Sequence, residues 1–248
     1  LERLERGDCP YVSAAQIGRY DVYFSFTGGP ILRHLEQQLG SPRAVELNCA
    51  VDPTVHRPSR TTPRFDLGYL GTYSIDRQAH VDELLLAPAL AWPDGRFVVA
   101  GSMFPDRSAW PANVAHLEHL PPERHADFYP AQRFTLNVTR TQMRRWGHSP
   151  SVRLFEAAAC GVPVITDRWA GIERYFVPNR EVLVADDRHD VLAILRDLGE
   201  HRRSSIARAA RERVIAEHTA DHRVRVLEAE LARGRGGARG SGAAEVDA

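Results

Sequence analysis

A regular alternation of short apolar segments with amphipathic ones constrains the fold of this chain more than any other feature. Between residues 66 and 198, six short segments have the length and the β-branched or aromatic content of buried strands. They lie at 66–71, 96–101, 115–120, 134–138, 163–166 and 181–184. Strands that alternate with helices predict an α/β fold with a parallel, doubly wound, Rossmann-like sheet of six strands.

Segments with helical periodicity separate most of these strands. We expect helices at 75–87, 122–130, 150–160, 171–176 and 187–198, and a loop at 102–113, which holds two prolines. A long amphipathic helix is expected over 201–232, with a break near Thr219. The stretch 233–248 is rich in glycine and low in complexity, which predicts a disordered tail.

The N-terminal part holds a single strand–helix–strand unit. After a polar, irregular stretch over 1–19, strands are expected at 20–26 and 44–48, with a helix between them that ends near Leu39. This unit is too short to form a domain, and the chain begins with Leu1 in the middle of a pattern. We therefore expect 1–57 to be the remnant of an N-terminal domain and hinge, and 58–232 to be a complete C-terminal domain.

Composition excludes several classes of function. Thirty-two basic residues balance 32 acidic ones, so no general attraction to nucleic acid is expected. No apolar run approaches the ~18 residues of a membrane-spanning helix. Three widely spaced cysteines fit neither a disulfide framework nor a zinc site, which favours a reducing, cytoplasmic location. The chain contains no lysine, so any cation that binds phosphate must be arginine or histidine.

The stretch 147–167 is the most informative for function. Ser149 followed by Pro150 predicts the start of a helix, with the serine as its N-cap, and Gly161 predicts its left-handed end. Val164, Ile165 and Thr166 then form one of the expected strands.

Within that helix, Ser149, Arg153 and Glu156 fall at i, i+4 and i+7 and share one stripe. A glutamate among apolar residues must be paired, hydrogen-bonded or next to a ligand. One interpretation is an Arg153–Glu156 ion pair within the helix, worth roughly 0.2–0.5 kcal/mol. The other is a phosphate site, in which Ser149, Ser151 and Arg153 supplement the amides and the positive dipole end of the helix.

The expected topology favours the phosphate site. In a six-stranded doubly wound sheet the usual strand order is 3-2-1-4-5-6, and ligands bind where that order reverses. The loops at 71–77 and 139–149 follow the first and fourth strands and are rich in small, hydroxyl and arginine residues. In the second loop, Arg144 is as compatible with solvent exposure as with a diphosphate contact, and a lone histidine such as His148 is more often neither acid, base nor ligand.

Several motifs together resemble a known family. RRWGHSPSVRLFEAAACGVPVITDRWAGIERYFVPNREVLVADD is similar to the signature of CgeB-type, spore-maturation-protein-like glycosyltransferases, relatives of the retaining group 1 glycosyltransferases with the GT-B fold. DLGYLGTYSIDR, GRFVVAGSMFP and RERVIAEHTADHR match in the same order. The similarity covers nearly all of 10–230, and residues 20–58 resemble the last unit of the acceptor-side domain with the hinge.

The resemblance implies a UDP- or GDP-sugar donor held mainly by the C-terminal domain. Because fixed positive charge can assist the departure of the diphosphate and no paired-aspartate motif is present, we expect no metal and no cofactor. Glu156 matches the second glutamate of the E-x7-E motif, which is expected to hold the ribose hydroxyls, whereas His148 stands at the first and is the catalytic candidate. Arg77, with Arg153 or Arg144, would replace the arginine–lysine pair that clamps the diphosphate. The expected donor-binding residues are Gly71, Thr72, Tyr73, Arg77, Arg144, Ser149, Ser151, Val152, Arg153 and Glu156.

The sequence leaves the acceptor open between a glycan, a protein and a lipid, and leaves open a peripheral association with a membrane. Two other functions remain alternatives to sugar transfer. A sugar-nucleotide-binding module without turnover is favoured by His148 in place of a glutamate. A nucleotide-sugar epimerase would use the same two-domain fold.

Overall fold

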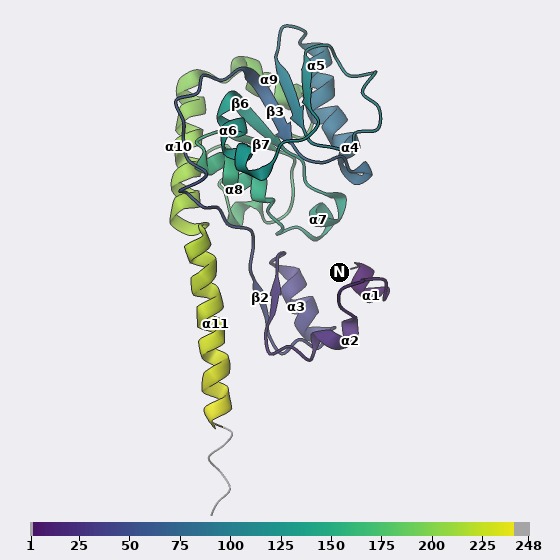
Figure 1. Ribbon diagram of the computed structural model, residues 1–248, viewed down its shortest axis with the longest axis vertical. Helices are drawn as coiled ribbons and strands as arrows, with labels where there is room; N and C mark the ends of the chain where they lie inside the picture. The colour runs from purple at the N-terminus through teal and green to yellow at the C-terminus, as the bar shows by residue number, and fades with distance from the viewer. Residues whose placement is uncertain (1, 241–248) are drawn as a thin grey trace, which may run out of the picture. The chain divides into compact units, whose positions relative to one another are not determined.

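The computed structural model describes residues 2–240, which divide between two compact units (Figure 1). The larger unit runs from Cys49 to Thr219. The smaller unit combines the residues up to Asn48 with those from Ala220 onward. The sequence analysis instead expected a boundary near 57 and assigned 220–232 to the larger domain.

The larger unit is built on a parallel sheet of six strands. These are β3 (Phe65–Leu70), β4 (Phe97–Ala100), β5 (Val114–Leu117), β6 (Gln132–Asn137), β7 (Val164–Thr166) and β8 (Leu183–Val184). Their order is β5-β4-β3-β6-β7-β8, with Leu67 of β3 opposite Phe97 on one side and Phe134 on the other. The six predicted strands and the predicted order are therefore confirmed, and the order reverses between β3 and β6.

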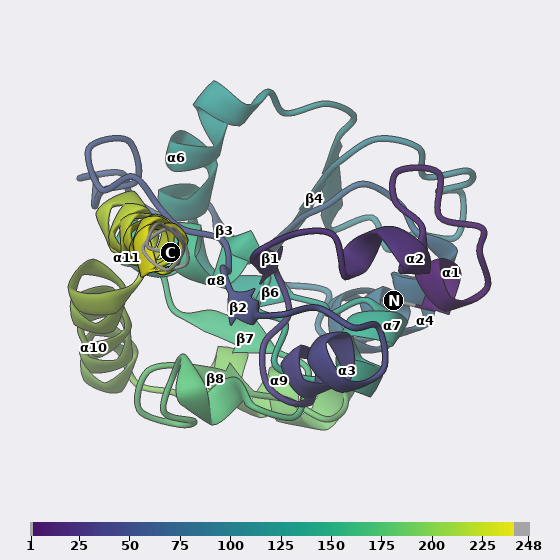
Figure 2. The ribbon, with the colours of Figure 1, turned by 90° about the horizontal axis from the view of Figure 1, so that it is seen from below.

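Helices cover both faces of this sheet (Figure 2). They are α4 (Ile75–Val81), continued by a π-helical turn (Asp82–Leu86) and α5 (Ala87–Ala91), then α6 (His125–Phe128), α7 (Thr141–Trp146), α8 (Val152–Ala159), α9 (Arg188–Asp197) and α10 (Glu200–Glu217). Short 3₁₀ turns lie at Pro122–Arg124, Tyr129–Ala131 and Ile172–Arg174. The helix α7 was not predicted, because the segment 139–149 was interpreted as a loop.

Hydrophobic clusters lie on both faces of the sheet. On one face, Leu67, Phe97 and Phe134 pack with Leu84 and with Val191 of α9. On the other face, α8 packs on α10, with Leu154, Phe155 and Val214 in the same cluster. All residues of α8 except Val152 and Glu156 are buried, which agrees with its alanine-rich sequence.

The smaller unit contains a second, two-stranded parallel sheet. Its elements are α1 (Glu2–Glu5), α2 (Ala14–Ile17), β1 (Tyr23–Ser25), α3 (Pro30–Gln37), β2 (Ala44–Glu46) and α11 (Ala220–Gly240). The strand–helix–strand unit is as predicted, whereas α1 and α2 lie in the stretch that was expected to be irregular.

The helix α11 is bound to the N-terminal segment by polar contacts. Arg43 NH2 donates to Glu230 Oε1 at 2.7 Å, and Arg223 Nε donates to the carbonyl oxygen of Asn48 at 3.1 Å. The predicted break near Thr219 separates α10 from α11 and is confirmed. The helix continues to Gly240, past residue 232 where the tail was expected to begin, and 241–248 lie outside the described residues.

Candidate functional site

A cavity of about 380 Å³ opens at the carboxyl ends of β3 and β4, next to the start of α8. Its wall is formed by Leu70, Gly71, Thr72, Ala100, Gly101, Ser102, His119, Leu120, Pro122, His125, Tyr129, Val152, Arg153 and Glu156. Five of the predicted donor-binding residues are in this wall: Gly71, Thr72, Val152, Arg153 and Glu156. The cavity lies beside the reversal of strand order, where a ligand is expected in such a sheet.

The helix α8 begins two residues later than predicted. Its N-cap is Ser151, with an extended backbone at ψ 143°, so the prediction of Ser149 as the N-cap is wrong. Ser149 is buried, with 1% of its surface exposed, and is not part of the cavity wall. Gly161 ends the helix with φ 75°, as predicted, and its N–H donates to the carbonyl oxygen of Ala158 at 2.9 Å.

Arg153 is held by hydrogen bonds along one side of its guanidinium group. Nε donates to the carbonyl oxygen of Leu70 at 2.5 Å, and NH1 donates to Asn137 Oδ1 at 2.8 Å and to Ser151 Oγ at 3.2 Å. The guanidinium carbon lies 5.2 Å from the centre of the Tyr69 ring. Within residues 2–240 the other terminal nitrogen, NH2, has no hydrogen-bond partner. Arg153 therefore presents a charged group to the cavity in one fixed orientation.

Glu156 has partners other than Arg153. Tyr129 OH donates to Glu156 Oε2 at 2.7 Å, His56 Nε2 lies 3.7 Å from Oε1, and His125 Nδ1 lies 4.0 Å from Oε2. Burial, and then the charge of Glu156, raise the pKa of Tyr129 well above its ordinary value. Because the two side chains have separate partners, the interpretation of an Arg153–Glu156 ion pair within α8 is not supported.

Two buried donors near this cavity lack acceptors. Arg77 is 7% exposed, and its NH2 donates to the carbonyl oxygen of Thr72 in the cavity wall at 2.6 Å. Arg77 Nε and the hydroxyl of Tyr69 are buried without a hydrogen-bond partner among the described residues. Burial lowers the pKa of Arg77, and the nearby charges of Arg153 and Arg140 act in the same direction. Unpaired buried donors are costly, so a cluster of them indicates a site for an anion.

Glycine at position 71 is required by this arrangement. A Cβ atom there would lie 2.6 Å from the hydroxyl of Tyr69 and 3.1 Å from Arg153 NH2. At Gly101, on the neighbouring strand end, φ is 155° and a Cβ atom would lie 2.1 Å from the carbonyl oxygen of Gly71. The two loops therefore approach each other through their backbones, and side chains larger than hydrogen would close this part of the cavity.

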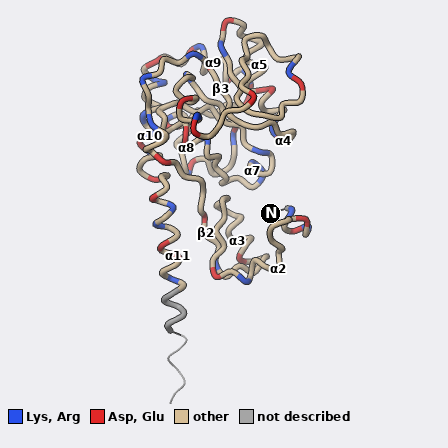
Figure 3. The backbone as a smooth tube through the Cα atoms, viewed as in Figure 1, with Lys and Arg blue, Asp and Glu red and all other residues tan. Residues whose placement is uncertain are grey.

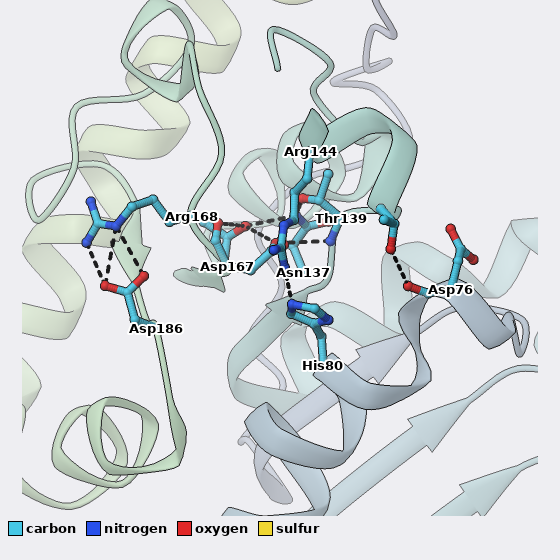
Figure 4. A network of polar contacts seen from close by, with 10 residues as sticks. Asp76, His80, Asn137, Thr139, Arg144, Asp167, Arg168 and Asp186 are labelled. Carbon is cyan, nitrogen blue, oxygen red and sulfur yellow. Dashed lines mark hydrogen bonds and ion pairs between the residues drawn. The ribbon is translucent and has the colours of Figure 1, made fainter. Parts of the chain in front are cut away.

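Arg144 lies outside the cavity wall, in a polar network between α7 and α4 (Figure 4). Its NH1 contacts His80 Nε2 and lies 3.8 Å from Asp167 Oδ2. In addition, Thr141 Oγ1 donates to the carbonyl oxygen of Asp76 at 2.7 Å. These contacts hold α7 against the start of α4, so Arg144 is engaged in supporting the loop.

His148 and Tyr73 also lie outside the cavity wall. His148 has a left-handed backbone, φ 47°, and its N–H donates to the carbonyl oxygen of Ala170 at 2.6 Å. A Cβ atom on Gly171 would lie 2.2 Å from His148 Nδ1, so the imidazole packs against that glycine. The Tyr73 ring contacts Phe104, with ring centres 5.7 Å apart. The catalytic role of His148 stays a prediction.

Several residues that border the site were not predicted from the sequence. Tyr69, His125 and Tyr129 border the cavity or the guanidinium group of Arg153, and Asn137 and His56 contact predicted site residues. Asn137 was detectable as a polar residue at the end of a buried strand, between Leu136 and Val138. Tyr69 precedes the predicted residue Gly71 but has the pattern of a core residue, and the segments of His56, His125 and Tyr129 are brought to the site only by folding.

Acidic and basic residues are interspersed along α10 and α11 (Figure 3). None of the helices in residues 2–240 combines the length and the apolar character needed to span a bilayer. Within the same residues, no group of three or more His, Cys, Asp or Glu side chains is arranged to hold a metal ion.

Comparison with solved structures identifies the fold. Sucrose-phosphate synthase from Thermosynechococcus elongatus matches 91% of this chain with a TM-score of 0.68 and 17% sequence identity. HepE from Anabaena, solved with UDP and glucose, matches 87% of this chain with a TM-score of 0.68 and 12% sequence identity. This chain spans 61% and 64% of those two proteins, respectively. A third match is the C-terminal domain of LpcC, a group 1 glycosyl transferase from Francisella tularensis, with a TM-score of 0.53 and 13% sequence identity. The match covers 99% of that domain and 68% of this chain.

Comparison at the sequence level gives the family. A search of curated proteins found no match to the chain. A family model described as glycosyl transferase-like, in contrast, matches residues 77–229, which include most of α4, the cavity residues of α8 and five of the six strands of the sheet. The six-stranded parallel sheet, its strand order and this match agree: the chain belongs to the glycosyl transferase-like family, and its larger unit has the fold of the C-terminal domain of GT-B glycosyltransferases.

Proposed function

We propose that this chain is the donor-binding part of a glycosyltransferase that moves a sugar from a nucleoside-diphosphate sugar to an acceptor hydroxyl. One observation carries this function: Arg77 Nε and the Tyr69 hydroxyl are buried without acceptors beside Arg153, whose NH2 is unpaired within the described residues. A diphosphate supplies several anionic acceptors in a small volume, which is what such a cluster requires.

The chemistry follows from where charge develops. The bond between the sugar carbon C1 and the diphosphate oxygen breaks, its electron pair leaves with the diphosphate, and the acceptor oxygen bonds to C1. The proton of the acceptor hydroxyl passes to the departing diphosphate. Negative charge therefore grows on the diphosphate as the bond lengthens. Arg153 and the first amides of α8, which have no acceptors within the helix, would stabilise that charge.

The rest of the cavity suits a nucleoside. The Glu156 carboxylate receives one hydrogen bond from Tyr129 and retains lone pairs for the two ribose hydroxyls, the role implied by the E-x7-E resemblance. Leu70, Ala100, Leu120 and Pro122 give the cavity an apolar wall against which a base can pack. UDP is the first nucleotide to test, because HepE from Anabaena was solved with UDP and with UDP-glucose.

Finer features of the function rest on the resemblance. We propose a CgeB-type enzyme that retains the anomeric configuration, works without a metal and acts in the cytoplasm. His148 stands where the family has the first glutamate of its motif, and it is the candidate for the catalytic group of the full protein. The acceptor is a glycan, a protein or a lipid, and an acceptor in a membrane would need only peripheral association.

A binding module without turnover is the second candidate, and one observation favours it. The imidazole of His148 packs against Gly171, and the residue is not in the cavity wall. If the full-length protein binds the donor but neither transfers nor hydrolyses its sugar, the module is the better description. Conversion of the sugar without an acceptor would instead select the epimerase.

Calorimetry with the wild-type chain tests the proposed function. We expect saturable binding of UDP or GDP, with weaker binding of the corresponding 2′-deoxynucleotide because Glu156 then loses a hydroxyl partner. Glu156→Gln should reduce the difference between the two ligands. Glu181→Gln is the matched control, since Glu181 is also buried but pairs with Arg213 and with the N–H of Val177. Folded protein that binds none of the common nucleoside diphosphates would disprove the proposal.

A further inference from the structure

Asn137, at the end of β6, is completely buried, and its amide group contacts three side chains. Oδ1 accepts from Arg153 NH1 at 2.8 Å. Nδ2 lies 2.9 Å from Thr166 Oγ1 and 3.4 Å from Thr139 Oγ1. The amide of Asn137 is thus the link between the end of the sheet and the arginine that faces the cavity.

The neighbouring groups fix which way this amide points. Thr139 Oγ1 donates its single proton to Asp167 Oδ1 at 2.8 Å, and the N–H of Thr139 donates to the same oxygen at 3.0 Å. The Thr139 hydroxyl can therefore only accept from Asn137. Figure 4 shows Asn137, Thr139 and Asp167 side by side in this network. With Nδ2 directed to the hydroxyls, Oδ1 is left for Arg153.

An amide has a chemical advantage over a carboxylate at this position. A carboxylate would form a buried ion pair with Arg153 and cancel its positive charge. The neutral amide oxygen accepts one hydrogen bond and leaves the charge available to another anion. Within the described residues, Arg153 donates hydrogen bonds only to neutral acceptors: the carbonyl oxygen of Leu70, Oδ1 of Asn137 and Oγ of Ser151.

The geometry points to Asn137 as a positioning residue for the diphosphate site: it orients Arg153 through NH1 and leaves NH2, with the full charge, for the phosphates. This role rests on the proposed function and extends it, because it identifies the residue that orients the guanidinium group of Arg153. Asn137 itself is not in the cavity wall and acts only through Arg153.

The test compares the affinities of UDP and uridine, whose ratio isolates the contribution of the diphosphate. Asn137→Asp should lower that ratio at least tenfold, because the new carboxylate neutralises Arg153, while uridine binding is retained. Thr166→Val removes one of the hydroxyls that hold the amide, preserves the side-chain shape, and should lower the ratio by a smaller factor. This second variant also serves if Asn137→Asp does not fold.

Asn113→Asp is the matched control. Asn113 Nδ2 donates to the carbonyl oxygens of Ala89, Trp92 and Gly95 at 2.9–3.1 Å, away from the cavity. We expect this variant to lower the melting temperature and to leave the UDP-to-uridine ratio unchanged.

The outcomes separate the two proposals. If Arg153→Met lowers the ratio but Asn137→Asp and Thr166→Val both leave it at the wild-type value, the positioning role is wrong and the proposed function stands. If the folded wild-type chain binds neither UDP nor GDP, both are overturned. A ratio lowered in Asn137→Asp and preserved in Asn113→Asp supports the role of Asn137.

Discussion

Arginines at the two ends of strand β3 differ in how their charge is compensated: Arg133 and Arg96 at its start are half-buried and exposed, whereas Arg77 and Arg153 at its end are buried. At its start, Asp66 Oδ1 accepts from Arg133 NH1 at 3.1 Å, and Asp66 Oδ2 accepts from the N–H of Arg96 at 2.9 Å. At its end, Arg77 and Arg153 lie near each other, and neither forms an ion pair with a carboxylate among the described residues. Both arrangements use the same strand and its neighbours, but only the first neutralises its charges within the protein.

This difference separates a structural from a functional use of the same residue type. A buried cation without a counter-ion costs free energy, and such a cost persists where a ligand supplies the missing charge. Ligands of doubly wound sheets bind at the carboxyl ends of the strands, and the unpaired arginines lie at that end. Charge compensation thus distinguishes the two ends more sharply than residue type does.

The largest expected effect is at the unpaired end. Arg153→Met should weaken UDP binding by about 10- to 150-fold, the equivalent of the roughly 1.5–3 kcal/mol of a hydrogen bond to a charged group. Arg133→Met is the control: it removes an arginine from the paired end and should leave the affinity unchanged. Titration calorimetry of both variants measures the contrast, and equal losses in the two variants would remove the distinction between the ends.

The second-largest expected effect is a loss of stability at the start of β3, where Asp66 pairs with Arg133 and Arg96. Asp66→Asn should lower the free energy of unfolding by about 1.5–3 kcal/mol, because Arg133 and Arg96 lose their charged acceptor. UDP affinity should not change. Urea denaturation and calorimetry on the same preparation measure both quantities. A variant that keeps its stability and loses affinity would place the functional end at Asp66.

Arg77→Met should have effects of opposite sign on stability and binding. Without ligand, removal of a buried guanidinium whose Nε lacks a partner should raise the free energy of unfolding by about 0.5–2 kcal/mol. The same change should weaken UDP binding about tenfold, the equivalent of about 1.4 kcal/mol, since a cation close to Arg153 at the proposed diphosphate site is lost. Thermal melts with and without UDP measure both. A loss of stability without any change in affinity would show that Arg77 is structural.

The smallest effect is pH dependence from the network outside the cavity. Burial, and then the charge of Arg144, lower the pKa of His80 below its ordinary 6.5. Between the lowered pKa and 6.5 the unfolded chain binds more protons than the folded one, so this residue makes stability rise with pH across that window.

His80→Gln should remove that contribution. The difference in unfolding free energy between wild type and variant should therefore change with pH below 6.5 and stay constant above it, as measured by urea denaturation from about pH 5 to pH 8. UDP affinity should be the same in both proteins. If His80→Gln instead weakened UDP binding about as much as Arg77→Met, the network between α7 and α4 would be part of the binding site.

The alternation of apolar segments with helices was sufficient to predict the sheet. The six strands, their order and the reversal between β3 and β6 are as expected, because parallel connections have few allowed topologies. The cavity residues Gly71, Arg153 and Glu156 were also predicted from local patterns. The prediction was less accurate at the start of α8, where Ser149 and Ser151 are both plausible caps and only the packing of the preceding loop decides between them.

Other residues could not be assigned from the sequence. Arg144 and Arg153 are both arginines in or near the same expected loop, yet one contacts His80 and Asp167 and the other borders the cavity. The amphipathic pattern of 220–232 predicts a helix, but it does not specify the surface on which the helix packs. The helix α11 instead joins the N-terminal segment through Arg43 and Glu230.

The sequence by itself determined the six strands of the larger sheet, their order and most of the helices between them, because these follow from short-range periodicity and chain connectivity. Only the tertiary structure decided which buried donors lack an acceptor, as at Tyr69 and Arg77, and which amide orients Arg153. Whether a polar group is paired depends on neighbours far away in the chain, and the pattern of residues along one segment contains no information about them.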